Sequence, residues 1–168
     1  MLEREIVTLI NSQITKEFYS AYLYLDFSNY YEIHGLAGFA SWFKIQAKEE
    51  LDHGLIFSKY LHDNEESIKL DKIESPDTEI KELMDPLIAS LKHEQYVTES
   101  INKIYARALE LKDFRTTDFL SWFIKEQAEE EKSAQELITK MELTAHNNRG
   151  IYLLDRELSQ RVYVPTKK

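Results

Sequence analysis

The chain has 168 residues, of which 43% are hydrophobic and 30% are charged, a composition typical of a globular domain with a buried core and not of a disordered segment. It contains no cysteine, which excludes disulfides, thiolate zinc sites, iron–sulfur clusters and cysteine nucleophiles, and favours a cytoplasmic protein. Its formal net charge of −9 argues against nucleic-acid binding and favours attraction of cations, and no run of about 20 apolar residues predicts a membrane span.

Apolar residues recur at alternating spacings of three and four, which is the pattern of amphipathic helices. Four long helices are predicted, at residues 5–34, 37–64, 81–111 and 114–142, followed by a short helix at 149–158. Residues 65–80 are polar and include Pro76, so we expect a long connection there. Because the other two links are short, the first and second helices should be antiparallel, and likewise the third and fourth. These features predict an all-α four-helix bundle with one long crossover, folded as a single domain over residues 1–168.

The second and fourth predicted helices carry related segments. Residues 39–43 read Phe-Ala-Ser-Trp-Phe and residues 119–123 read Phe-Leu-Ser-Trp-Phe. Each segment is followed by a pair of glutamates, at 49–50 and at 129–130. The repeat indicates two related halves that meet around a symmetric centre.

One glutamate interrupts the apolar stripe of each long helix near its middle. These residues are Glu17, Glu50, Glu94 and Glu130. Mid-helix residues meet at one level of a bundle, whichever direction each helix runs. A carboxylate ionised in apolar surroundings costs several kcal/mol, and four together repel one another. Protonation, a neighbouring base or a metal cation would relieve this cost.

The residues around these glutamates favour a metal. No lysine or arginine occupies the central stripe positions, whereas His53 lies three residues after Glu50 and Gln127 three residues before Glu130, on the same helix faces. One imidazole with several carboxylates suits iron or manganese and can also take zinc. Glu-x-x-His together with single glutamates on other helices is the pattern of di-metal carboxylate bundles. The other histidines, His34, His62, His93 and His146, lie off the stripe and are expected at the surface or as helix caps.

Five segments distributed along the chain are informative when they are taken together. They are residues 11–17, 46–53, 92–95, 122–131 and 150–157. Jointly they resemble the non-haem ferritins of bacteria over nearly the whole chain, whereas Glu-Leu-Asp-His within the second segment would be weak evidence alone. The resemblance implies the ferritin-like fold, with a short fifth C-terminal helix after the bundle.

The resemblance also implies a two-iron centre within each subunit. Glu17, Glu50 and His53 would hold the first iron, and Glu50, Glu94 and Glu130 would hold the second. Glu50 would then bridge the pair. Of the ten tyrosines, any one on the stripe is most simply a core residue with a satisfied hydroxyl.

Further site residues follow from the same resemblance. Gln127 would stand beside the oxygen-binding position as a neutral hydrogen-bonding group. Tyr24, two helical turns from Glu17, would be a hydrogen-bond donor to the iron centre and a source of electrons. A third iron would lie nearby, and its ligands would be Glu49, Glu126, Glu129 and the shared Glu130.

Two positions separate the chain from the haem-binding bacterioferritins. Those proteins place a methionine just before the histidine of the second helix, where this chain has Asp52. They also carry a second Glu-x-x-His, whereas residues 127–130 here end in glutamate. Haem is therefore not expected.

The activity that the resemblance implies is iron storage with ferroxidase chemistry. Fe(II) would be oxidised by O₂ or H₂O₂, and ferric mineral would be deposited inside a homo-oligomeric shell of 24 subunits. One alternative is another di-iron oxidase or peroxidase of the ferritin-like superfamily, although the lack of cysteine removes the rubredoxin-like module of some peroxidases. A second alternative is a bundle whose site has decayed, which the presence of every proposed ligand disfavours.

Overall fold

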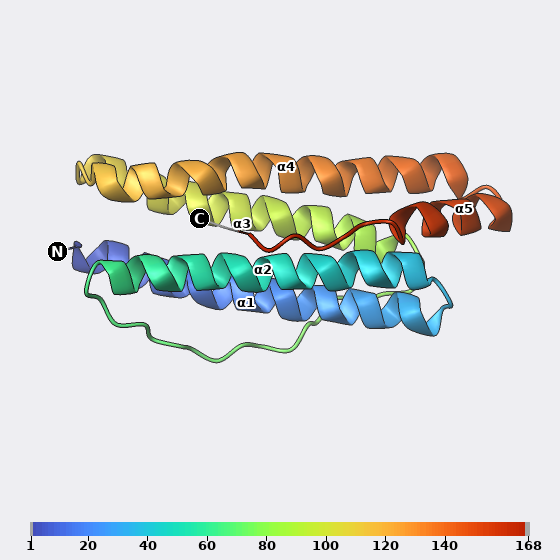
Figure 1. Cartoon of the computed structure of the whole chain (residues 1–168), viewed down its shortest axis with the longest axis horizontal. Helices are drawn as coiled ribbons and strands as arrows, with labels where there is room; N and C mark the ends of the chain where they lie inside the picture. The colour runs from blue at the N-terminus through green and yellow to red at the C-terminus, as the bar shows by residue number, and fades with distance from the viewer. Residues whose placement is uncertain (1, 167–168) are drawn as a thin grey trace.

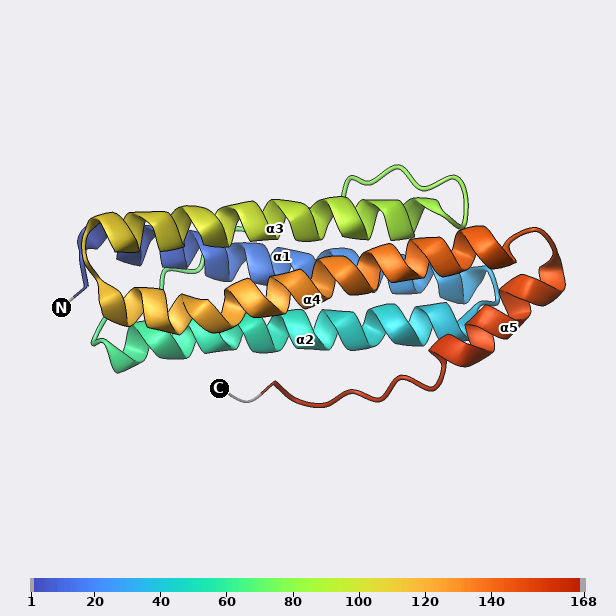
Figure 2. The ribbon, with the colours of Figure 1, turned by 90° about the horizontal axis from the view of Figure 1, so that it is seen from above.

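The computed structural model of the protein describes residues 2–166 and, over that range, contains five helices and no strand. The helices are α1 (Arg4–Ile33), α2 (Ala37–Asp63), α3 (Asp85–Glu110), α4 (Phe114–Thr144) and α5 (Asn148–Leu158). The first four run side by side along the long axis, and α5 crosses one end of the bundle (Figure 1 and Figure 2). The predicted fold class, a four-helix bundle with a long crossover and a short fifth helix, is confirmed.

The long connection 64–84 runs the length of the bundle and returns the chain to the end at which α2 began (Figure 1). Consequently α2 and α3 run in the same direction, and the antiparallel pairs are α1 with α2 and α3 with α4. The third helix begins at Asp85, later than the expected residue 81. The Asp85 carboxylate accepts the backbone N–H groups of Lys81 and Glu82, at 2.8 Å each, in a turn that precedes the helix. Pro86 then fits the first helical turn, where its missing N–H is not needed.

Two apolar clusters fill the interior of the bundle. The first includes Phe27, Phe39 and Phe43, and the second includes Phe57 and Phe123. The related segments of α2 and α4 therefore belong to different clusters, because these helices start from opposite ends of the bundle. The four glutamates that interrupt the apolar stripes belong to neither cluster.

Helix α5 is held against the start of α2 by close backbone contact. The backbone N–H of Phe39 donates to Asp155 Oδ1 at 3.0 Å. Gly38 permits this approach, since a Cβ atom at that position would lie 1.7 Å from the carbonyl oxygen of Asp155. The placement of α5 determines where the C-terminal segment begins.

Replacing Gly38 by alanine should displace α5 from the bundle. The added methyl group would collide with backbone, which cannot rotate away, so we expect a loss of about 1–3 kcal/mol of stability. Hydrogen exchange should accelerate over residues 148–158 and remain slow in the core of α2. The exposed substitution Lys44→Ala serves as the control, and equal protection of α5 in both variants would contradict this role of Gly38.

Candidate metal centre

A layer of polar side chains crosses the middle of the bundle. Each long helix contributes one glutamate, and Glu17, Glu50, Glu94 and Glu130 are 1%, 1%, 2% and 8% exposed. His53 on α2 is 1% exposed. These acidic side chains are therefore among the most deeply buried groups in the protein, as a metal centre within the bundle requires.

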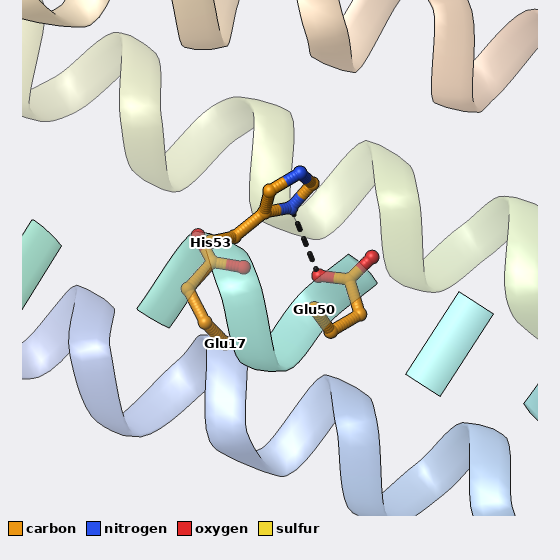
Figure 3. A group of neighbouring side chains, drawn as sticks. All are labelled: Glu17, Glu50 and His53. Carbon is orange, nitrogen blue, oxygen red and sulfur yellow. Dashed lines mark ion pairs between the residues drawn. The ribbon is translucent and has the colours of Figure 1, made fainter. Parts of the chain in front are cut away.

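Glu17, Glu50 and His53 converge from α1 and α2 (Figure 3). Each offers one ligand atom, and these atoms lie within 4.8 Å of one another. His53 Nδ1 is 3.5 Å from Glu50 Oε2. Neither ring nitrogen of His53, nor Glu17 Oε2, has a hydrogen-bond partner among the described residues. Buried polar atoms nearly always have partners, so these unpaired atoms fit the donor set of a metal ion.

His53 also belongs to a second group, with Glu126 and Glu130 of α4. The ligand atoms of these three residues again lie within 4.8 Å of one another. Glu130 is buried, whereas Glu126 is partly exposed. The two groups share His53, so they mark overlapping candidate positions for a cation.

Glu94 lies outside both groups and makes its own hydrogen bonds. The hydroxyl of Tyr24 donates to Glu94 Oε1 in a short hydrogen bond, and Gln127 Nε2 donates to Glu94 Oε2 at 3.0 Å. Both predicted supporting residues therefore contact the same carboxylate. These two donors orient Glu94. The remaining lone pairs of the Glu94 carboxylate are available to a metal ion.

The electrostatics of the layer favour a bound cation. Burial raises the pKa of Glu17, Glu50 and Glu130 well above the ordinary value, and the neighbouring carboxylates raise each pKa further. Burial also raises the pKa of Glu94, although its hydrogen bonds to Tyr24 and Gln127 oppose that rise. A divalent cation would reverse this effect, because it stabilises the ionised carboxylates that bind it.

Two glutamines for which the sequence patterns predict no role support the layer. Gln13 Nε2 donates to Glu17 Oε1 at 2.8 Å, and Gln46 Nε2 donates to Glu130 Oε2 at 2.6 Å and to Glu50 Oε1 at 3.4 Å. The signal was present, since each glutamine lies four residues before a central glutamate on the same helix face.

His93 also differs from its expected surface or capping position. Its Nε2 is 2.7 Å from Ser20 Oγ, and its ring packs edge-on against Tyr24, with 6.0 Å between centroids. Burial lowers the pKa of His93 to about 4, so the ring is neutral near pH 7. It therefore adds no charge beside Tyr24.

The residues predicted to form the third site do not lie together in one group. Glu126 joins the second group, Glu129 is exposed, and Glu49 is partly buried and paired with Arg161 of the C-terminal segment. Burial raises the pKa of Glu49, and the Arg161 guanidinium opposes that rise. Of the predicted ligands, Glu49, Glu94 and Glu129 lie outside the two groups. The metal-binding roles of all the predicted ligands stay predictions.

A helical bundle with a buried layer of carboxylates and one histidine defines the class of ferritin-like proteins. Residues 7–144 match the ferritin family, described as a ferritin-like domain, and the chain belongs to this family. It is 35% identical to the bacterial non-heme ferritin of Campylobacter jejuni over 156 residues, covering 93% of each chain. It is 34% identical to the bacterial non-heme ferritin of Escherichia coli O157:H7, covering 95% of this chain and 96% of the relative.

Solved structures agree with this assignment. An open-pore ferritin from the hyperthermophilic archaeon Archaeoglobus fulgidus matches with a TM-score of 0.94 and 35% identity, covering 96% of this chain and all of the other. An engineered closed form of the Archaeoglobus fulgidus ferritin matches with a TM-score of 0.95 and 34% identity, covering 98% of this chain. The resemblance to the bacterial non-haem ferritins is thus confirmed.

Across residues 2–166, no helix has an apolar stretch long enough to cross a membrane.

Replacing Glu50 by glutamine should stabilise the metal-free protein at high pH. Since the folded-state pKa of Glu50 is raised above the unfolded value of about 4.3, its ionisation destabilises the fold as the pH rises through the folded-state pKa. Glu50→Gln should therefore increase Tm more near pH 8 than near pH 5, by the equivalent of about 1–3 kcal/mol. Calorimetry of chelator-treated protein measures the effect. The exposed Glu142→Gln is the control, and an equal gain in both variants would refute the burial argument.

Proposed function

We propose that the protein is an iron-storage ferroxidase that oxidises Fe(II) in the carboxylate layer. The observation that carries the proposal is the cluster of unpaired ligand atoms on Glu17 and His53, beside Glu50 and within a ferritin-family chain. A structural core would not leave both nitrogens of a buried imidazole without a hydrogen bond. Fe(II) is the substrate and the cargo of this site.

The proposed ligand sets are the two that the resemblance implies, and they share Glu50. Glu17, Glu50 and His53 would bind one Fe(II), and Glu50, Glu94 and Glu130 would bind the other. Binding would displace protons from carboxyl groups whose pKa values burial has raised. Each Fe(II) would then lose one electron. O₂ would take both electrons and two protons to give H₂O₂, or H₂O₂ would take them with two protons to give two waters.

The protein contributes charge and geometry to this reaction. Several carboxylates stabilise Fe(III) more than Fe(II), because the attraction grows with the charge of the ion. Burial and the adjacent Glu94 raise the pKa of Tyr24, so its hydroxyl stays protonated and continues to donate to Glu94. Gln46 donates to Glu130 in the same manner. These donors keep the second ligand set oriented while the charge on the metals changes.

Storage requires an enclosed space, which a single bundle lacks, and we propose a homo-oligomeric shell of 24 subunits. An exposed apolar surface on α1 and α2 supports association between copies. Tyr22, Leu25, Leu51 and Leu55 are between 44% and 59% exposed, and an apolar groove of about 460 Å³ lies among the first three of them. Tyr152 and Leu153 of α5 are exposed as well and would take part in contacts between subunits.

We expect this shell to work in the cytoplasm and without haem. Asp52, at the position where haem-binding relatives have methionine, accepts hydrogen bonds from Tyr163 and from the backbone of Thr166. Its side chain is therefore committed to the C-terminal segment. An absorption spectrum of the purified protein without a haem Soret band would agree with this expectation.

Replacing Glu50 and His53 together by alanine should abolish rapid Fe(II) oxidation. Both residues would be direct ligands, so the initial rate should fall by more than the roughly 100-fold that loss of a supporting residue costs. Stopped-flow absorbance under air measures this rate. Light scattering should still give a particle of roughly half a megadalton, because the apolar surfaces that join subunits are unchanged.

The exposed pair Glu142 and His146 provides a matched control for that double variant. Replacing both by alanine removes the same two side-chain types outside the layer. Oxidation should then proceed at the unmodified rate. If the Glu50 and His53 double variant oxidises Fe(II) as fast as this control, the assignment of the first site is wrong.

Replacing Glu126 and Glu129 by alanine should affect later turnovers rather than the first. Neither residue belongs to the two proposed ligand sets of the di-iron centre, whereas both belong to the proposed third site. The initial burst of oxidation should persist, and the ratio of Fe(II) oxidised to O₂ consumed should change. An oxygen electrode measures this ratio, and loss of the first turnover would contradict the third-site assignment.

A further inference from the structure

The C-terminal segment 159–166 runs back from α5 alongside α2, towards the middle of the bundle (Figure 1 and Figure 2). It is fastened to α2 by Asp52, which accepts the hydroxyl of Tyr163 at 2.7 Å and the backbone N–H of Thr166 at 2.9 Å. Lys48 Nζ lies 5.3 Å from the centre of the Tyr163 ring. The segment is thus anchored to the helix that carries Glu49, Glu50 and His53.

Arg161 of this segment contacts side chains of α2 that lie beside the polar layer. Its Nη2 donates to Glu49 Oε2 in a short hydrogen bond, and its Nη1 donates to Gln46 Oε1 at 2.9 Å. The guanidinium lies over the ring of Trp42, 4.5 Å from its centroid. The side chains of Arg161 and Glu49 are only 26% and 18% exposed, so solvent screens this ion pair less than an ordinary surface pair.

Gln46 connects Arg161 to the layer. Its Oε1 accepts from Arg161, which turns its Nε2 towards Glu130, at 2.6 Å, and towards Glu50, at 3.4 Å. Arginine has donors and no acceptor, so only this orientation of the amide satisfies both sides. With the amide reversed, its oxygen would face the carboxylates. Arg161 therefore holds Gln46 in the orientation that supports Glu130.

We propose that Arg161 is a positioning residue that competes with the third metal ion for Glu49. It would neutralise Glu49 while that site is empty, and it would have to leave when a cation binds there. An arginine cannot lose its proton at physiological pH, so the guanidinium must move away from Glu49 for the charge to leave. By linkage, metal at the third site favours release of Arg161 from Glu49, and Arg161 held on Glu49 weakens metal binding. This inference rests on the proposed third site of Glu49, Glu126, Glu129 and Glu130.

Metal binding can be measured without oxidation by titrating Zn²⁺ into the metal-free shell with a calorimeter. Relative to the unmodified protein, Arg161→Ala should bind the third equivalent per subunit about tenfold more tightly, the scale of one charge-assisted hydrogen bond. The first two equivalents should change much less. Arg161→Lys keeps the charge but cannot hold Glu49 and Gln46 with one planar fork, so its third-equivalent affinity should lie between the two.

Trp42 provides a second readout that a purely structural role of Arg161 would not change. The chain has two tryptophans, so Trp122→Phe makes Trp42 the only one. In that background, Trp42 emission should change at the third Zn²⁺ equivalent, because the guanidinium leaves the ring. The change at this step should vanish in Arg161→Ala. It should persist in Arg156→Ala, which removes an exposed arginine of α5.

The possible outcomes separate this inference from the proposed function. If the third Zn²⁺ equivalent binds to Arg161→Ala no more tightly than to the unmodified protein, Arg161 does not compete with the metal. That result would leave the di-iron proposal intact. A third equivalent that is absent from both proteins overturns the third site and this inference together. Zn²⁺ binding that survives unchanged in the Glu50 and His53 double variant overturns the proposed function itself.

Discussion

Burial of four carboxylates at one level of a helical bundle is the constraint on which the rest of this structure depends. Glu17, Glu50, Glu94 and Glu130 are at most 8% exposed, and no lysine or arginine among residues 2–166 is buried with them. Ionised carboxylates in this setting repel one another and lose hydration. The polar hydrogens of Gln13, Gln46, Gln127 and Tyr24 recover part of that loss. A bound cation would supply the remainder, which fits the unpaired ligand atoms of Glu17 and His53.

The two halves of the chain are related but chemically unequal at this layer. The aromatic segments of α2 and α4 belong to opposite apolar clusters, and each helix continues from its segment to a central glutamate. His53 of α2 corresponds to Ser133 of α4, and Gln127 of α4 corresponds to Ala47 of α2. One half therefore supplies an imidazole, and the other supplies an amide that binds Glu94. Related helices would thus produce two unlike metal positions, as the proposed ligand sets require.

Local patterns made much of this arrangement predictable. Helical periodicity located the helices, and interruptions of the apolar stripe located the buried glutamates. The predicted start of α3 is too early because the turn before the helix depends on Asp85 accepting two backbone N–H groups. The role of Arg161 had no local signal, since Glu49 is 112 residues away in the sequence and the C-terminal segment has no periodicity. Contacts of this kind are determined by how α5 docks, and only the fold reveals them.

The most direct test of the central claim is the position of iron in a crystal soaked anaerobically with Fe(II). Anomalous scattering at the iron edge should give one peak among Glu17, Glu50 and His53, and a second among Glu50, Glu94 and Glu130. Both peaks should disappear when Glu50 and His53 are replaced by alanine. Iron found only on exposed acidic residues, with none in the buried layer, would contradict the account.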